Sequence, residues 1–576
     1  MSVVWFWLIQ DARARWRTWV LWTALVGFGG GIALTAFAGA RRTDAAVPQM
    51  LTYSRPDDGS VAFGQFCPPQ HVTGPNATSL APLPVEARVL RLPQVASFQR
   101  EMFLFASVRP IFDASSNLNV IATADAQGYR TLDRPLIVAG RVPDPTSGSD
   151  VWVNVLAANM LHVHVGSEVR LYTYSAAQLQ GCGNLVGAQS HGPAPNGPVL
   201  TVRIAGIGRL PTDVNAVLPL AQAAGVNYEG QSNMFLGPGF VARYAASLGI
   251  PVHDVLGTNI YYVRLRHGQS DWSAFSTAAS KSDPNALVQS EADGGSSGEQ
   301  AAAASAQRGV HVEVVALVLF GAFAVLVTLV LAGQLIARQI LIERDEYALL
   351  RSLGARHAQI RVVVLSRAAL VGAAASIVAV AVAIVASPLM PFGLARQAEL
   401  HPGVDVDAPV LAAGLAVIGI LVVALAVVPA IVVSRGPLDQ TRPSDAPSRQ
   451  PRLGRLLALT ALPITTVMGV RFGLRRGRGR TAVPVGSALV GAIAAVATLV
   501  GALTFAASLD HLIRTPRQQG WNWDVLVGNP NTTSDPWSAT VPKLAHNQLV
   551  GSYSGMVDLN GGFTLDGHVV ANVLAI

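Results

Sequence analysis

Long apolar runs with at most one charged residue alternate with polar stretches along this chain, and each run is long enough to form a membrane-spanning helix. A helix needs about twenty mainly apolar residues to cross the hydrocarbon core of a bilayer. The pattern predicts five such helices, at residues 20–40, 312–337, 362–386, 409–433 and 483–507. The interval between the first two runs is far longer than a structureless loop in a compact protein. We therefore predict an α-helical membrane protein of about five spans with one large folded domain between the first two.

The interval at residues 43–311 combines the patterns of both regular structures. Apolar runs separated by clusters of Gly and Pro predict strands at residues 151–156, 168–174, 199–207 and 259–265. Other segments predict helices, at residues 96–106, 219–224 and 301–308. This mixture indicates an α+β domain, and the last of these helices leads directly into the second span.

The connector between the second and third spans (residues 343–359) is charged and amphipathic. Leu349, Leu350 and Leu353 recur at helical spacing, and charged residues lie beside them: Glu343, Arg344, Glu346 and Arg351. Gly354 follows where a helix is expected to end, because glycine readily takes the left-handed conformation that terminates helices. The pattern predicts a helix at the membrane surface that another protein can contact and move. An interfacial helix without a partner is the alternative interpretation.

The distribution of charge predicts an orientation in the membrane. Mean hydropathy is +0.40 and only 13% of the residues are charged, so the formal charge of +7 rests on few groups. Arginines concentrate in two segments, at residues 338–361 and 435–480, and loops with this bias face the cytoplasm. This places the amino terminus inside and the carboxyl terminus outside, with Trp16, Trp19 and Trp22 as interfacial anchors of the first span. The basic excess therefore indicates anionic lipid headgroups as partners rather than nucleic acid.

Several kinds of site are excluded by the residues themselves. The chain has two lysines, Lys281 and Lys543, and neither follows the Gly-x4-Gly spacing of a phosphate-binding loop, so it supplies no ATPase site. His162 and His164 lack a third ligand at suitable spacing and are expected to be packing or surface residues. Ionisable residues, which ion-coupled transporters need within the membrane, do not occur at residues 314–337, 368–386 and 410–433. We expect no catalytic residue, cofactor or metal ion in this chain.

The two cysteines, Cys67 and Cys182, both fall in the large domain. Because that domain is predicted to face an oxidising compartment, a disulfide between them is expected. The long loop that it closes would contribute about 3 to 5 kcal/mol by constraining the unfolded chain. Two free buried thiols are the alternative.

The connector resembles the signature of FtsX-like permeases, the membrane subunits of MacB-type ABC systems. That signature has an acidic residue, then Leu-Arg-small-Leu-Gly-Ala, then a basic stretch and Gln. Here these positions are Glu346, residues 350–355, Arg356 and Gln359. Arg367 is a departure, because such families often place a glutamate there, which puts any ion pair of that glutamate in doubt.

The large domain resembles the extracytoplasmic core domain of MacB-like proteins, which grips or encloses a substrate or a partner. The similarity consists of a Gly-Arg-x-Pro motif, an acidic-Val-x-Val strand and a following turn, at residues 140–143, 150–154 and 162–166.

The fifth span and the segments around it also resemble the internal repeat of two-unit FtsX-like permeases. One full unit and the start of a second are therefore expected, as in a fragment or shortened gene product. The resemblance and the pattern together divide the chain into an N-terminal cytoplasmic segment with the first span (1–42), a MacB-like core domain (43–311), an FtsX-like domain with three spans (312–434), a basic cytoplasmic linker (435–482), a fifth span (483–507) and the start of a second extracytoplasmic domain (508–576).

The resemblance implies a permease subunit of an ABC transporter in a bacterial cell membrane. A separate cytoplasmic ABC ATPase dimer would bind ATP and Mg and drive motions of the outward domain, for export or extraction of lipid, lipoprotein or peptide. The residues expected to couple to that ATPase are Glu343, Glu346, Leu350, Arg351, Leu353 and Gly354. One alternative is a non-transporting signal transmitter that activates a cell-wall hydrolase, and another is a membrane-anchored receptor without an ATPase.

Overall fold

The protein divides into two compact units. The computed structural model describes residues 2–63, 80–111, 118–180, 193–214, 232–255, 259–291, 299–352 and 354–435, and shorter pieces between 489 and 575. The first unit, here the helical unit, comprises Met1–Asp44, His311–Arg396 and His401–Gln519. The second, here the sheet unit, comprises Ala45–Val310, Gln397–Leu400 and Gly520–Ile576.

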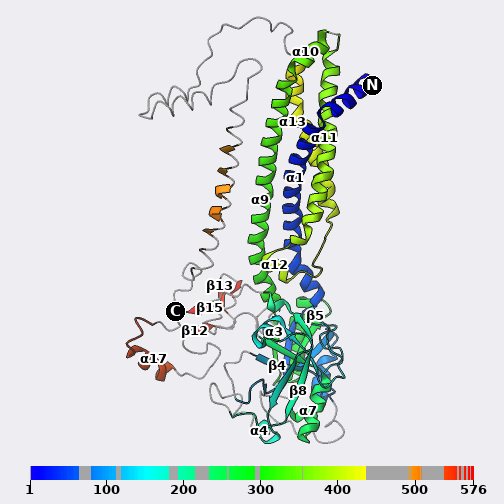
Figure 1. The fold of residues 1–576 in the computed structure, drawn as a ribbon. Helices are drawn as coiled ribbons and strands as arrows, with labels where there is room; N and C mark the ends of the chain where they lie inside the picture. The colour runs from blue at the N-terminus through cyan, green and yellow to red at the C-terminus, as the bar shows by residue number, and fades with distance from the viewer. Residues whose placement is uncertain are drawn as a thin grey trace. The chain divides into compact units, whose positions relative to one another are not determined.

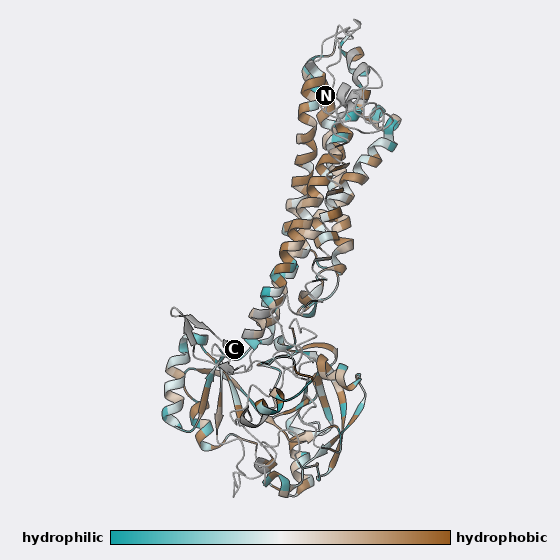
Figure 2. Cartoon of the chain, turned by 90° about the vertical axis from the view of Figure 1, so that its left-hand side faces the viewer, coloured by the Kyte–Doolittle hydropathy of each residue, from teal (hydrophilic) through white to brown (hydrophobic). Residues whose placement is uncertain are grey.

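Among the described residues, four long helices build the helical unit, and two of them extend beyond its bounds. They are α1 (Ser2–Ser54), α9 (Glu299–Ile342), α11 (His357–Ala386) and α13 (Ala408–Arg435). The four run alongside one another (Figure 1), and they are hydrophobic along much of their length (Figure 2). Within the described residues, these are the helices long and apolar enough to cross a membrane, and they contain the first four predicted spans. About half of the residues of the fifth predicted span, 483–507, lie outside the described residues.

Glycines let α1 approach α11 closely. A Cβ atom on Gly27 would lie 2.6 Å from Cγ1 of Val378, and one on Gly31 would lie 2.6 Å from Cβ of Val382. Both distances are shorter than a real carbon contact, so a larger residue at either position would push the two helices apart. Small residues at such contacts are typical of helices that pack within membranes.

Arg41 and Arg42 follow the first predicted span on the side where the charge pattern predicts the outside. The Arg42 guanidinium donates to the carbonyl oxygens of His401 (2.9 Å), Gly403 (3.0 Å) and Ser387 (3.3 Å), and Arg41 lies 3.4 Å from the Asp407 carboxylate. These bonds tie the end of the apolar part of α1 to the segment between α11 and α13. The two arginines therefore have a structural role that accounts for basic residues on this side.

Among the described residues, the sheet unit has one eleven-stranded sheet. Its strands are β1 (Gly59–Phe63), β2 (Val95–Phe103), β3 (Ala106–Ser107), β4 (Leu118–Thr123), β5 (Leu136–Gly140), β6 (Asp150–Asn154), β7 (Glu168–Thr173), β8 (Val199–Arg209), β9 (Ser232–Leu236), β10 (Asn259–Leu265) and β11 (Leu287–Ser290). They lie in the order β11-β1-β10-β2-β4-β9-β6-β8-β7-β3, with β5 paired to β8. The β4–β9 and β6–β8 pairs are parallel and the others are antiparallel.

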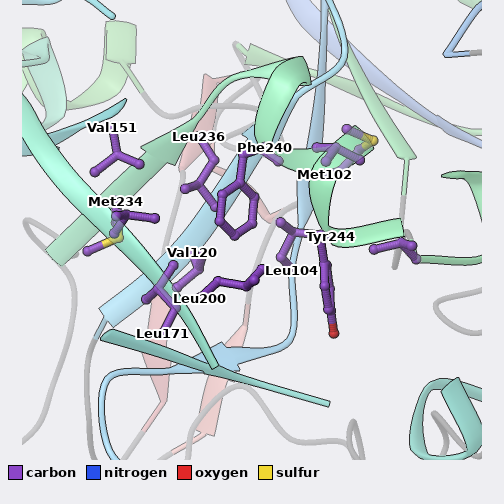
Figure 3. Packing of buried hydrophobic residues seen from close by; sticks show 14 of the residues in the cluster. Met102, Leu104, Val120, Val151, Leu171, Leu200, Met234, Leu236, Phe240 and Tyr244 are labelled. Atoms are coloured by element: carbon purple, nitrogen blue, oxygen red, sulfur yellow. The ribbon is translucent and has the colours of Figure 1, made fainter. Parts of the chain in front are cut away.

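Short helices complete two apolar cores of the sheet unit. One core joins β4, β6, β7, β8 and β9 to α3 (Val155–Leu161), α4 (Ala176–Gln180) and α7 (Pro238–Leu248), and it includes Phe240 and Tyr244 of α7 (Figure 3). The other joins β1 and β10 to α2 (Pro84–Leu90) and α8 (Trp272–Ser282). Further along the chain lie α17 (Trp537–Ala545) and two strand pairs, β12 (Val557–Leu559) with β15 (Val573–Ala575) and β13 (Phe563–Leu565) with β14 (His568–Val570).

The structure confirms the four predicted strands, which appear as β6, β7, β8 and β10. The helix predicted at 96–106 is wrong, because residues 95–103 form β2. Phe98 and Met102 have the spacing of a helix face, but pairing of β2 with both β10 and β4 decides the conformation. The helix predicted at 301–308 is part of α9, and the one at 219–224 lies outside the described residues.

Candidate functional site

The connector forms a separate nine-residue helix, α10 (Arg344–Ser352), which begins soon after α9 ends. Leu350 is half-buried and packs against an apolar cluster that includes Ile336 and Tyr347. Leu349, the residue directly before it in the sequence, is 62% exposed. One side of α10 is therefore bound to the helical unit, while another side presents a leucine.

Gly354 ends this helix in a Schellman arrangement. The N–H of Gly354 donates to the carbonyl oxygen of Arg351 (2.9 Å), and the N–H of Ala355 donates to that of Leu350 (3.0 Å). This pair of bonds requires a left-handed residue, and Gly354 has φ of +96°. Leu350 and Ala355 also pack against the same apolar cluster, which is the hydrophobic contact that usually accompanies the motif. The turn therefore needs a glycine at position 354 because of the left-handed backbone conformation there.

The next helix begins immediately after this turn. The Gln359 side chain accepts a hydrogen bond from the backbone N–H of Arg356 (2.8 Å), just before α11 starts at His357. This bond satisfies one of the backbone donors that a helix start leaves unpaired. The Gly-Ala-Arg-x-x-Gln portion of the connector thus encodes a sharp helix-turn-helix junction.

Four buried or half-buried charged residues cluster at the start of the connector: Asp11, Arg15, Glu343 and Arg367. They are called the ion cluster here. The Arg367 Nη1 atom lies 2.7 and 2.9 Å from the two carboxylate oxygens of Glu343, and 3.5 Å from Oδ2 of Asp11. The Arg15 Nη1 atom lies 2.6 Å from Oε1 of Glu343 and 3.5 Å from Oδ1 of Asp11. Residues from α1, α11 and the connector therefore meet at one carboxylate.

Glu343 is the centre of this cluster and is only 1% exposed. Its carboxylate also accepts hydrogen bonds from Gln339 and from the Tyr347 hydroxyl, the latter at 2.8 Å. Burial opposes the charged form, but the Arg367 guanidinium together with these hydrogen bonds holds the pKa of Glu343 below its usual value. Glu343 is therefore a carboxylate at neutral pH, locked between two arginines.

Arg367 is 4% exposed and is held within α11 by charges and by aromatic rings. Its guanidinium lies 5.6 Å from the ring centroid of Trp19 and 5.3 Å from that of Trp22. In the described part of the chain, its Nε and Nη2 atoms have no hydrogen-bond acceptor. Both Glu343 and Arg367 line a cavity of about 20 Å³, which is large enough for one water molecule.

The structure revises the interpretation of two features. The departure at Arg367 does not abolish an ion pair, because the arginine binds Glu343. Trp16 is exposed, as an interfacial anchor would be, but Trp22 is buried and faces Arg367. Trp22 therefore belongs to the packing of the ion cluster.

The predicted coupling residues fall into different environments. Glu343 is buried, whereas the Glu346 side chain is 49% exposed and binds Nη2 of Arg15. Arg351 is half-buried on α10, and Leu353 lies outside the described residues. The connector pattern does not indicate Asp11, Arg15 and Tyr347 as parts of the site, and it marks Arg367 only as a departure from the family signature. A charge at the edge of an otherwise apolar helix, as at Arg367, is the signal that could have identified them.

Other candidate ligands of the sequence do not gather into a site. His162 is the left-handed residue that ends α3, and the His164 ring lies 2.7 Å from the Ser167 hydroxyl. No group of three or more His, Cys, Asp or Glu residues suited to a metal ion occurs within the ranges that the structure describes. Cys67 and Cys182 lie outside those ranges, so their disulfide stays a prediction.

Comparison with known families identifies the segment that contains the connector and Arg367. Residues 318–437 match the family model described as FtsX-like permease C-terminal, which confirms the prediction of an FtsX-like permease. The match begins within α9 and includes the connector, α11 and α13. Among curated proteins, none matches this chain.

Proposed function

We propose that this FtsX-like permease is the membrane subunit of an ABC transporter and that its connector receives a separate ATPase. The observation that carries the proposal is α10 itself. It is a short helix between two membrane-type helices, bound on one side through Leu350 and Glu343 and exposing Leu349 on another. It lies inside the segment that matches the permease family.

The connector has the construction that a mechanical coupling element needs. Leu349 offers an apolar side chain that can be buried in a groove of a partner, as amphipathic helices commonly are. Glu343 links the base of α10 to α1 and α11 through its ion pairs. A push on α10 would therefore reach both helices rather than bend a loose loop. In this proposal, Leu349 joins the predicted coupling residues, and Leu350 and Glu343 anchor the helix.

ATP and Mg would be bound by a cytoplasmic ATPase dimer, since neither lysine of this chain has the spacing of a phosphate-binding loop. ATP-driven closure of that dimer would move the outward domain and export or extract a lipid, lipoprotein or peptide. The arginine bias supports a position of α10 on the cytoplasmic side. The similarity to FtsX-like permeases supports a bacterial cell membrane as the location.

Replacing Leu349 with Asp should abolish copurification with an ABC ATPase encoded beside this protein and co-expressed with it. The change places a charge where an apolar contact is proposed, but Leu349 is exposed, so the permease itself should fold and insert normally. Leu287→Asp is the matched control, because it makes the same change at an exposed position of the sheet unit. Equal copurification of Leu349→Asp and the parent protein would contradict the proposed docking site, and no copurification with the parent would contradict the ATPase partner.

Replacing Gly354 with Val should uncouple ATP hydrolysis from outward motion while leaving membrane insertion intact. Valine at φ of +96° is strained by about 1 to 3 kcal/mol, so the Schellman turn between α10 and α11 should be distorted. Apart from its chain neighbours, no atom of the residues that the structure describes lies within 4 Å of the new Cβ, so the effect is conformational rather than a clash. The measurement is ATPase activity of the complex together with substrate release, with Gly354→Asn as a control that tolerates the left-handed conformation better. Unchanged coupling in the valine variant would count against the role of this turn.

A further inference from the structure

We propose that Arg15 is the positioning residue through which movement of the connector reaches the first membrane helix, and that residues 2–14 turn about it. The inference rests on the proposed function, because it assumes a partner that moves α10. In this inference, residues 2–14 are a second element that moves, in addition to the connector.

The backbone of α1 is interrupted at Arg15. This residue has φ of −126° and ψ of 27°, outside the helical range, while the residues on both sides are helical. The long α1 is therefore two helices joined at one residue, 2–14 and 16–54. Sharp breaks of this kind have local causes such as proline or an inserted side chain. The sequence has no proline near Arg15, so the interactions of Arg15 itself are the available cause.

The Arg15 guanidinium joins this break to both ends of the first turn of the connector helix. One nitrogen, Nη1, binds the buried Glu343, which immediately precedes α10. The other, Nη2, binds Glu346, which lies within the first turn of α10. A planar guanidinium holds two acceptors in a fixed geometry. The direction of residues 2–14 is therefore linked to the orientation of α10.

The two contacts differ in how easily they can change. Glu343 would stay paired with Arg367 if Arg15 withdrew, and Asp11 would keep Arg367 as a neighbour at 3.5 Å. Glu346 is half-exposed, and solvent-exposed ion pairs contribute little net stability. Arg15 can therefore leave Glu346 without stranding a buried charge. The remaining Glu343–Arg367 pair would keep the base of α10 in place while the amino-terminal segment moves.

The amino-terminal segment has a composition suited to the membrane surface. Trp5, Phe6 and Trp7 lie close together in the sequence, and aromatic residues of this kind favour the interface between lipid and water. Motion of α10 would thus change the angle at which residues 2–14 leave the first span. The partner that drives this change of angle is the ATPase in its ATP-bound form.

The test measures the angle at Arg15 as a distance between two spin labels. The labels are placed at Ile9→Cys and Val20→Cys, both exposed positions on the two sides of the break, in a protein with Cys67→Ser and Cys182→Ser. The complete permease with its ATPase is measured in lipid nanodiscs, with and without Mg and a non-hydrolysable ATP analogue. The expected result is an ATP-dependent shift of the distance distribution in the parent protein.

Arg15→Gln should abolish that shift while the ATPase still copurifies, and Arg15→Lys should restore part of it. Glu346→Gln removes the exposed contact from the other side without touching the buried pair, and it should also abolish the shift. Arg13→Gln, at an exposed neighbouring position, should behave like the parent. An unchanged shift in both Arg15→Gln and Glu346→Gln would overturn the inference and leave the proposed function intact. Failure of the parent protein to bind an ATPase would instead overturn the proposed function.

Discussion

A variant with methionine in place of Arg367 is expected to unfold with a free energy about 3 to 5 kcal/mol lower than that of the parent protein. Glu343 and Asp11 are both buried, and removal of Arg367 leaves Arg15 as the cation that faces them in the ion cluster. Arg15 is partly exposed and contacts only one oxygen of Glu343, so the two buried carboxylates would share a weaker partner than Arg367. Buried negative charge without full compensation is costly, whereas the methionine side chain fits the volume of the arginine stem. The measurement is chemical or thermal unfolding of the detergent-solubilised permease.

The second variant in this experiment removes both charges of the Glu343–Arg367 ion pair. Glu343→Gln combined with Arg367→Met should recover much of the loss, because replacing a buried pair with neutral groups is often close to neutral in stability. Arg361→Met is the matched control, since Arg361 is only half-buried on the same helix and lies outside the ion cluster. If Arg367→Met and Arg361→Met had the same small effect, the ion cluster would not be the structural base of the connector.

Raising the pH from about 4 to 8 is expected to lower the stability of the sheet around β2 by on the order of 3 kcal/mol through Glu101 alone. Burial raises the pKa of Glu101 to about 7, although hydrogen bonds from the Tyr129 hydroxyl (2.6 Å) and the Gln99 amide (2.8 Å) oppose the change. Because the pKa is higher in the folded state than in the unfolded state, the folded protein binds the proton more tightly. The stabilisation is complete below the unfolded pKa near 4.5 and is lost as the pH rises through about 7.

Neighbouring carboxyls act in the same direction. Burial, and then the charge of nearby carboxylates, raise the pKa values of Asp133 and Glu299 well above their usual range. Hydrogen exchange of the β2 and β10 amides in the complete protein measures the local effect. Glu101→Gln should flatten the pH dependence, while Glu168→Gln, at an exposed position of β7, should leave it unchanged. A Glu101→Gln profile as steep as that of the parent would contradict the assignment to Glu101.

The sequence predicts the membrane helices and the connector well because their signals are local. Apolar length alone locates the spans within α1, α9, α11 and α13, and one glycine with its neighbours predicts the end of α10. The strands β6, β7, β8 and β10 were predictable from runs bounded by turn residues. β2 was not, since its apolar spacing is ambiguous and its conformation depends on pairing with strands far away in the chain.

The ion cluster could not be predicted because its members are distant in sequence. Arg15 and Glu343 are separated by 328 positions, and only the packing of α1 beside α11 brings Asp11 and Arg367 together. The same limit applies to the leucines of the connector. A helical pattern identifies Leu349 and Leu350 as parts of an amphipathic helix, but which of them faces the helical unit depends on where Ile336 and Tyr347 lie.

Cross-linking at the connector tests the central proposal most directly. A permease with Cys67→Ser and Cys182→Ser receives one cysteine, either at Leu349 on α10 or at Val404 in the segment between α11 and α13, both exposed positions. The co-expressed ATPase is then treated with a short thiol-to-amine cross-linker in native membranes. A cross-linked permease–ATPase band with Leu349→Cys and none with Val404→Cys is the predicted result. Cross-linking from Val404, or none from Leu349 in a complex that copurifies, would contradict α10 as the ATPase-docking helix.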